Sequence, residues 1–170
     1  MEFRRAVVSD INRIMDIIKQ AQAYLKEQGI DQWQNNYPNP EVIREDIEKG
    51  YGYVLLKDGK IIGTAAVSFD GEKTYEKIYD GNWLSSFDYA VIHRIAVDSD
   101  FKGQGFASVI IKNVEKMCSD KGVYSVRVDT HEDNKSMQRL LEKNGFQFCG
   151  IIYLADNSKR LAFEKLVINS

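Results

Sequence analysis

The sequence predicts an α+β fold in which a mixed, mostly antiparallel twisted sheet carries helices on both faces. Three observations support this fold class. Two β-branched runs on either side of Asp58-Gly59 indicate an antiparallel hairpin. A strand, a glycine-rich loop, a helix and another strand follow in order over 89–130, which is the order of a parallel crossover. A second hairpin is expected over 146–168, so antiparallel pairs outnumber the parallel one.

The first elements follow from hydrophobic spacing and from helix-start signals. A short strand over 3–6 leads to Ser9, the expected N-cap of a first amphipathic helix. Pro38 and Pro40 exclude a continuous helix there, because proline restricts the residue before it. A second, short helix is therefore expected to start near Glu41.

The remaining elements are placed in the same way. Strands are expected at 51–57, 60–69, 89–97, 124–130, 146–154 and 161–168. The helix of the crossover presents an apolar face formed by Phe106, Ile110, Val114 and Met117. A last helix is opened by Asp133 or Asn134 and is stopped by Gly145.

Composition limits the classes of protein that need to be considered. The 170 residues, 44% of them hydrophobic and without a Pro/Gly/Ser linker or a repeat, predict one domain over 1–170. Twenty-three basic against 25 acidic side chains argue against nucleic acid as a partner. The chain has neither a signal-peptide pattern nor an apolar run of about 18 residues, so we expect a cytoplasmic protein without a membrane segment. Cys118 and Cys149 form no disulfide framework, and no spacing of side chains suggests a metal site.

Gly103 and Gly105 lie just before the helix of the crossover. Glycine opens backbone conformations that other residues avoid, and the helix start supplies N–H groups and a positive dipole end, so the loop can bind an anion such as phosphate. A glycine pair is also common in ordinary connections. A P-loop is excluded because no Lys follows Gly105. A dinucleotide fingerprint is one residue short and is separated from its strand by 98–102, although Asp129 lies where the ribose acid would be expected.

The run Lys102-Gly-Gln-Gly-Phe-Ala107 resembles the Arg/Gln-x-x-Gly-x-Gly/Ala signature of the GNAT superfamily of acyl-CoA-dependent N-acetyltransferases. The resemblance extends over nearly the whole chain. It includes the strand that ends Ile95-Ala-Val97, and a helix that starts at Asn134 and is followed by Gly145-Phe146. It therefore implies the acyl-CoA N-acyltransferase fold.

The resemblance also implies acetyl-CoA as a co-substrate and no metal. Main-chain groups of the Ile95-Ala96-Val97 strand end would bind the pantetheine arm. Asn134 would contact the same cofactor. Lys102 keeps a cation near phosphate but lacks the planar fork of the usual Arg. The pyrophosphate would be cradled by the loop and helix start, formed by Lys102, Gly103, Gln104, Gly105, Phe106, Ala107 and Ser108.

Catalytic residues are less clearly marked than the cofactor motif. The family commonly uses a Tyr seven residues after the Asn as the acid that protonates the leaving thiolate, and that position is Leu141 here. Tyr153 and Cys149 are candidate replacements, although a strand Tyr is more often a core or interface aromatic. Coenzyme A could also leave without an acid, because thiol pKa values are near 8.5.

Three side chains are candidates for the base that deprotonates the acceptor amine. Asp129 is expected to share a strand face with Arg127, with a salt-bridged or capping Asp as the alternative. His93 should alternate in step with Val91 and Ile95 and is a candidate base or a core histidine. His131 follows the next strand and is a candidate base or a surface histidine.

The acceptor is expected to be an amine of a small molecule or peptide, attacked directly in a ternary complex. Trp33 and Tyr37 lie in the segment that lines the acceptor site in the family, although Trp33 could instead pin this loop to the core. The stretch 75–88 would form either a rim of the same site or a homodimer contact. A different class of function, a catalytically weak acyl-CoA sensor or regulatory module, stays open because the usual acid is missing.

Overall fold

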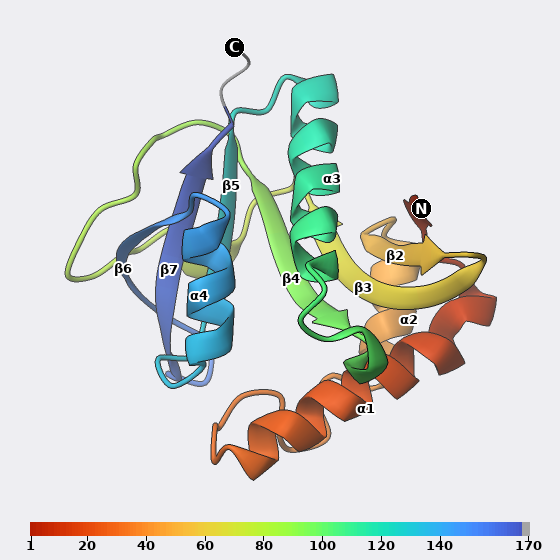
Figure 1. Ribbon diagram of the computed structural model, residues 1–170. Helices are drawn as coiled ribbons and strands as arrows, with labels where there is room; N and C mark the ends of the chain where they lie inside the picture. The colour runs from red at the N-terminus through yellow and green to blue at the C-terminus, as the bar shows by residue number, and fades with distance from the viewer. Residues whose placement is uncertain (168–170) are drawn as a thin grey trace. The chain divides into compact units, whose positions relative to one another are not determined.

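The computed structural model describes residues 1–167, which contain a seven-stranded mixed sheet and four α-helices (Figure 1). The strand order is β1-β2-β3-β4-β5-β7-β6, and β4 and β5 run parallel. The strands are Glu2–Arg5 (β1), Gly52–Lys57 (β2), Lys60–Ser68 (β3), Ala90–Val97 (β4), Ser125–Thr130 (β5), Gln147–Tyr153 (β6) and Lys159–Leu166 (β7). The helices are Ile11–Glu27 (α1), Pro40–Glu48 (α2), Phe106–Lys121 (α3) and Lys135–Lys143 (α4). The expected fold class is therefore confirmed.

The chain divides into two compact units. The first unit comprises Met1–Val67 and His93–Asn113, and the second comprises Ser68–Ile92 and the chain from Val114 onward. Strand β4 and helix α3 each contribute residues to both units. The single domain expected over 1–170 stays a prediction.

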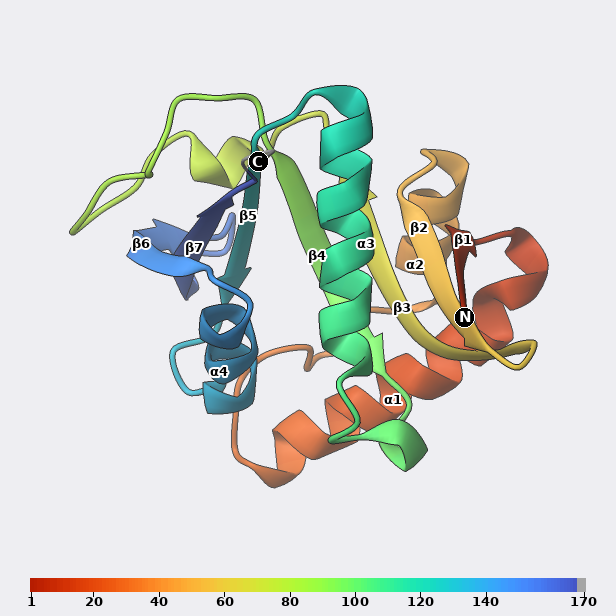
Figure 2. The same cartoon turned by 45° about the horizontal axis from the view of Figure 1, so that its top comes forward.

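In the first unit, strands β1 to β3 carry α1 and α2 on one face and the start of α3 on the other. Val54 and Leu56 pack in one cluster with the apolar side of α1. Leu55, between them, lies on the opposite face near Gly63, where an added Cβ would meet the Cδ1 atom of Ile110 at 3.0 Å. The two-residue period of the strand therefore separates the two layers, as Figure 2 shows for α2 and α3.

The first helix begins one residue later than expected. Ser9 lies in a 3-10 turn, Val8–Asp10, so the expected Ser9 N-cap is wrong. The carboxylate of Asp10 accepts from the backbone N–H of Val7 at 2.8 Å and pairs with Arg4 at 2.8 Å. Because Asp10 holds this corner, the chain needs no hydroxyl cap at Ser9.

Two other expectations for the first unit are confirmed. The helix expected to start near Glu41 begins at Pro40, after Asn39, whose side chain accepts from the N–H of Val42 at 3.0 Å. Asp58 and Gly59 both have positive φ, 52° and 79°, which is typical of a two-residue hairpin turn.

In the second unit, α4 and the segment 68–89 cover opposite faces of β5, β7 and β6, as both views show (Figures 1 and 2). Asn134 caps α4 through the N–H of Met137 at 3.1 Å, and Gly145 follows the helix with φ 86°. These boundaries were expected. Strand β7 starts two residues before the expected position, and Ile168, expected at its end, lies outside the described residues.

Strand β6 ends the sheet order and is contacted by the backbone of segment 68–89. Tyr79 and Ile151 exchange two backbone hydrogen bonds, of 2.8 and 2.7 Å. The chains approach so closely that a Cβ on Gly81 would lie 1.9 Å from the carbonyl oxygen of Cys149. Glycine is therefore required at this contact.

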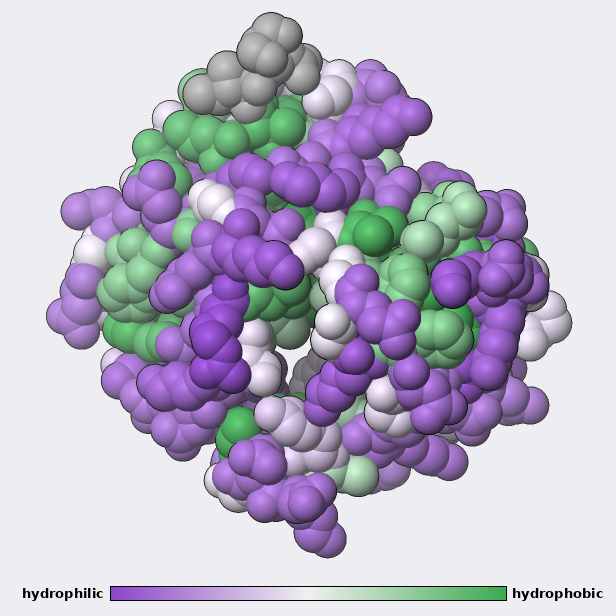
Figure 3. Space-filling view, in the orientation of Figure 1, coloured by the Kyte–Doolittle hydropathy of each residue, from purple (hydrophilic) through white to green (hydrophobic). Residues whose placement is uncertain are grey.

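Hydrophilic residues cover most of the face shown in Figure 3, with smaller apolar patches between them. Across residues 1–167 no helix is both long enough and apolar enough for a membrane crossing.

Candidate functional site

The glycine turn predicted to hold an anion lies in the first unit. Gly103 and Gly105 have φ values of 77° and 82°, which glycine adopts without strain. Apart from the glycine itself and the residues before and after it, no atom of residues 1–167 lies within 4 Å of a Cβ built on either glycine. Lys102, Gly103, Gln104 and Gly105 are all exposed. The backbone of this turn is therefore open to a ligand.

Helix α3 starts directly after this turn, at Phe106. The N–H of Val109 donates to the carbonyl of Gly105 at 3.2 Å, which joins the first turn of the helix to the glycine turn. The N–H groups of Phe106 and Ala107 belong to the first turn of α3, where the ladder of helical hydrogen bonds has not yet begun. Phe106 is buried and stacks edge-on against Phe101 at 5.9 Å, which anchors the helix start.

Helix α1 holds the chain that leads into the glycine turn. The guanidinium of Arg13 pairs with the Asp98 carboxylate and donates to the carbonyl of Ile61 at 3.0 Å. The side-chain oxygen of Gln20 accepts from the N–H of Ser99 at 2.8 Å. Burial alone would raise the pKa of Asp98, but the N–H of Asp100 and the charge of Arg13 lower it below its usual value.

Lys102, expected to keep a cation near phosphate, contacts an aromatic ring in this structure, and its phosphate contact stays a prediction. Its ammonium lies 3.6 Å from the ring centroid of Tyr24, on α1. Sequence reasoning missed the roles of Arg13, Gln20 and Tyr24, although a signal was present. Their spacing of seven and four residues puts all three on one face of a helix, where they form a polar stripe beside the apolar one.

Strand β4 is irregular where the expected alternation passes through His93. Arg94 has a φ of 52°, far from an extended strand, so side chains on either side of it cannot be assigned to faces by counting in twos. The expected alternation of His93 with Val91 and Ile95 is therefore interrupted. His93 and Val97 are half-buried, whereas Ile95 and Ala96 are buried.

The unusual backbone at Arg94 is supported by a two-pronged ion pair. Its guanidinium binds both carboxylate oxygens of Asp46 on α2, at 2.8 and 2.6 Å. A third nitrogen donates to the hydroxyl of Tyr37 at 3.0 Å. Burial opposes the charge of Arg94, yet Asp46 and Tyr37 raise its pKa above the ordinary value. Tyr37, one of the two expected acceptor residues, is thus fixed at its hydroxyl end while its body is exposed.

Trp33, the other expected acceptor residue, is partly buried and packs against the cluster between α1 and the strands. Side-chain amides tie its loop down. Gln22 donates to the carbonyl of Pro38 at 2.9 Å, and Gln34 donates to the carbonyl of Gln22 at 3.2 Å. This arrangement agrees with the alternative that Trp33 pins the loop.

In the second unit, the expected base Asp129 is engaged by a residue that sequence reasoning did not connect with it. The hydroxyl of Tyr75 donates to Oδ2 of Asp129 at 2.6 Å. Tyr75 is only 1% exposed, and burial followed by the charge of Asp129 raises its pKa well above the usual value. No local signal links positions 54 residues apart, so this pair could not be found from spacing.

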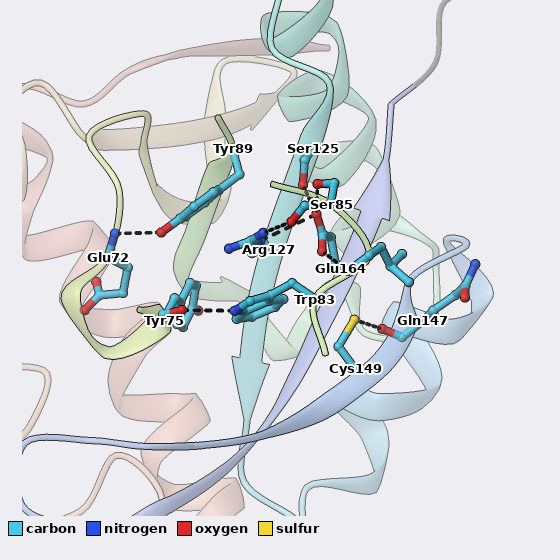
Figure 4. Close-up of polar contacts among 11 residues, drawn as sticks. Glu72, Tyr75, Trp83, Ser85, Tyr89, Ser125, Arg127, Gln147, Cys149 and Glu164 are labelled. Atoms are coloured by element: carbon cyan, nitrogen blue, oxygen red, sulfur yellow. Dashed lines mark hydrogen bonds and ion pairs between the residues drawn. The ribbon is translucent and has the colours of Figure 1, made fainter. Parts of the chain in front are cut away.

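A buried carboxylate ties segment 68–89 to β5 and β7 (Figure 4). Glu164 is fully buried and accepts from the N–H of Leu84 at 2.7 Å and from the hydroxyls of Ser85 and Ser125, each at 2.6 Å. Arg127 lies 3.5 Å from the same carboxylate and donates to the carbonyl of Ser85 at 2.7 Å. Three donors and one cation therefore compensate its burial.

Arg127 also fills the space between two aromatic rings. Its guanidinium carbon lies 4.1 Å from the ring centroid of Trp83 and 4.2 Å from that of Tyr89. Both rings also lie tilted against the ring of Tyr75, with centroid distances of 5.2 and 6.2 Å. Arg127 and Asp129 thus face the same segment, as expected from their two-residue spacing on β5.

The geometry of His131 disfavours a role as base. Its Nδ1 accepts from the N–H of Asp133 at 3.0 Å, so the neutral ring carries its proton on Nε2. In this form Nε2 carries a proton, and the lone pair of Nδ1 is already engaged by the N–H of Asp133. His131 thus serves the turn that leads into α4.

The candidate acids are also separated from the Tyr75–Asp129 pair. Tyr153 is 43% exposed and meets Tyr79 edge-on at 5.3 Å. Its neighbour Ile152 points to the other face of β6 and packs with Tyr75. Cys149 is buried, which raises its thiol pKa, and it donates to the carbonyl of Gln147 at 3.4 Å.

Two further positions of the family pattern lie on α4. Leu141, at the position of the usual acid, is an apolar side chain 1% exposed. The side-chain oxygen of Asn134, expected to contact the cofactor, caps the helix in this structure. The structure thus supports the helix start expected at Asn134.

Comparison with known proteins identifies the family. The family model described as the Acetyltransferase (GNAT) family matches residues 16–146. The chain belongs to the GNAT acetyltransferase family. It is therefore an acyltransferase, and the family typically uses acetyl-CoA as co-substrate.

GNAT relatives cover most of the chain. A crystal structure of a GNAT-family acetyltransferase from Streptococcus agalactiae 2603 is 36% identical, with a TM-score of 0.89 over 97% of this chain and 94% of that one. YesJ of Bacillus subtilis (strain 168), an uncharacterized N-acetyltransferase, is 24% identical over 94% of this chain and 87% of its own. An S-alkylcysteine N-acetyltransferase of the same organism is 26% identical over 67% of this chain and 58% of its own.

Replacing Glu164 by Ala should strongly lower the free energy of unfolding, because it leaves three donors and the buried Arg127 without their acceptor. We expect a loss of about 3–5 kcal/mol, measured by urea denaturation. Ser85→Ala is the matched control and removes one donor, for a loss of about 1 kcal/mol. Equal losses in the two variants would show that the carboxylate does not organise this network.

Proposed function

We propose that the protein transfers the acetyl group of acetyl-CoA to an amine of a small molecule or peptide, by direct attack in a ternary complex. The observation that carries this proposal is the open glycine turn at the start of α3. The turn presents backbone N–H groups where the family signature lies, and a Cβ at either glycine would intrude on that space.

The residues of the first unit fit acetyl-CoA. The N–H groups between Gly103 and Ser108 would hold the pyrophosphate, and the strand end at Ile95 and Val97 would bind the amides of the pantetheine arm. Arg13 and Gln20 fix the approach to the turn, so the N–H groups are oriented before the ligand arrives. Bound acetyl-CoA supplies an activated thioester.

We assign the removal of the amine proton to Asp129. Its position at the end of β5 and its hydrogen bond from Tyr75 support a carboxylate held in one orientation. His93 is the alternative base, because the geometry of His131 disfavours it. No side chain is assigned to protonate the thiolate, since Leu141 replaces the usual Tyr and a thiol leaves readily.

We assign acceptor recognition to the loop around Tyr37. The exposed body of Tyr37 is held by Arg94, whereas Trp33 anchors the loop. Two relatives are named as an S-alkylcysteine N-acetyltransferase and as a putative ribosomal-protein-alanine N-acetyltransferase. The acceptors to test first are therefore amino acids and peptide amino termini.

Replacing Gly105 by Glu should abolish binding of acetyl-CoA, because the new side chain puts bulk and negative charge into the open turn. Titration calorimetry with acetyl-CoA measures this directly. Gly122→Glu is the matched control, since Gly122 ends the same helix with φ 69° and equally open space. Undiminished binding by the folded Gly105 variant, or no binding by the wild type, would refute the cofactor assignment.

Asp129→Asn should lower kcat at least about tenfold while acetyl-CoA affinity stays within about threefold, because the change removes a base and not a phosphate contact. Thiol release with a panel of amines gives the rate. His93→Gln and His131→Gln are parallel variants. A fall confined to one histidine variant would reassign the base, and normal rates in all three would favour a water chain. A wild type that binds acetyl-CoA without releasing thiol would favour the sensor alternative.

Replacing Trp33 should lower stability, whereas replacing Tyr37 should weaken recognition of the acceptor. Trp33→Ala should lower the free energy of unfolding by about 2 kcal/mol, since its ring is partly buried in the core cluster. Tyr37→Ala should instead raise the KM of the acceptor, with aromatic contact contributing about 1 kcal/mol, and leave acetyl-CoA binding unchanged. The reverse pattern would make Trp33 the acceptor contact.

A further inference from the structure

Segment 68–89 places the hydroxyl of Tyr75 within hydrogen-bond distance of Asp129, the candidate base. The phenol is buried, and its hydroxyl donates to Oδ2 of Asp129 at 2.6 Å. A bond of this length to a carboxylate is charge-assisted and stronger than one between neutral groups. The pair joins the segment before β4 to the end of β5.

Tyr75 is held rigidly by its own segment. Its carbonyl accepts from the indole nitrogen of Trp83 at 2.9 Å. The 3-10 turn that carries it, Lys73–Tyr75, is capped by Glu72 through the N–H and hydroxyl of Thr74, at 3.4 and 3.1 Å. Glu72 is in turn fixed by its own N–H, which donates to the hydroxyl of Tyr89 at 3.2 Å. The direction of the phenol O–H bond is therefore set by the fold.

The same burial that holds Tyr75 makes it unsuitable as a proton donor to the thiolate. Desolvation first, and then the charge of Asp129, raise its pKa well above the ordinary value. It keeps its proton throughout the physiological range. Tyr75 thus has one chemical capacity at this place, which is to donate a hydrogen bond to the carboxylate.

Other charges surround the pair from three elements. Glu72 and Tyr89, from the same segment, also raise the pKa of Tyr75 through their charges. Arg127 on β5 faces the same side as Asp129, but it is bound to Ser85 and to Glu164 of β7. Arg127 is thus fixed between its aromatic neighbours, and Tyr75 is the neutral donor on Asp129.

We propose that Tyr75 is a positioning residue that holds the Asp129 carboxylate ionised and in one orientation for removal of a proton from the acceptor amine. This inference rests on the proposed function. The amine proton passes to Asp129, the nitrogen lone pair forms the new bond to the acetyl carbon, and the carbon–sulfur bond breaks to release the thiolate. Tyr75 keeps its own proton at every stage, and its hydrogen bond favours the charged carboxylate.

The experiment is the pH profile of kcat for Tyr75→Phe, with thiol release as the assay and an amine that the wild type acetylates. Loss of a donor that favours the charged carboxylate should move the acid limb of kcat to higher pH by about one unit. Lost orientation should lower plateau kcat about tenfold. The KM for acetyl-CoA should stay within about twofold, because the change touches no expected phosphate contact.

Tyr124→Phe is the matched control, since it removes a phenol hydroxyl from the same unit at an exposed ring that packs against Phe87 and not against the turn carrying Tyr75. Its pH profile should equal that of the wild type, and its change in melting temperature shows what the loss of a phenol hydroxyl alone costs. In an Asp129→Asn background, Tyr75→Phe should cost no further rate, because the two residues act as one unit.

A second measurement needs no change at Tyr75. In wild-type protein labelled with carbon-13 at tyrosine Cζ, one resonance should titrate with the midpoint of the acid limb of kcat, and this titration should vanish in Asp129→Asn. An unmoved acid limb in Tyr75→Phe, an equal shift in Tyr124→Phe, or no such resonance would overturn the proposal in an active enzyme. A wild type that neither binds acetyl-CoA nor releases thiol would instead overturn the proposed function, and this role with it.

Discussion

The organisation of the second unit depends on one buried anion, the carboxylate of Glu164. A charge without solvent is costly unless donors surround it, and here the donors come from Leu84, Ser85 and Ser125, with Arg127 beside them. Two of those residues belong to an irregular segment that has few backbone partners of its own. The carboxylate thus favours one conformation of that segment. This conformation also sets the position of Tyr75, which belongs to the same segment.

In the first unit, side chains from helices likewise hold irregular backbone in place. Arg13 and Gln20 hold the chain before the glycine turn, and the Arg94–Asp46 pair supports a residue with positive φ inside a strand. Such a backbone costs about 1–3 kcal/mol and persists only where its surroundings impose it. In both units, side chains from regular elements fix the irregular backbone at which the chemistry is expected.

Local signals predicted most of the fold, because turns, caps and hydrophobic periods are set by neighbouring residues. The Asp58-Gly59 turn, the Asn134 cap and the glycine turn could all be predicted in this way. The Ser9 cap was wrong because Arg4, on β1, and the N–H of Val7 hold the carboxylate of Asp10 at this corner. Contacts between residues far apart, such as Tyr75 with Asp129, leave no periodic trace, so the candidate site was predicted as a set of residues without its geometry.

The bridge between Tyr79 and Ile151 also bears on how the protein behaves at high concentration. A terminal strand normally offers unpaired N–H and C=O groups to any other extended chain, and this is a route to aggregation. At Ile151 both groups are already occupied by the protein's own backbone, at 2.8 and 2.7 Å. A strand of a second molecule would have to displace that contact. The close approach at Gly81 therefore disfavours association of two molecules through the edges of their sheets.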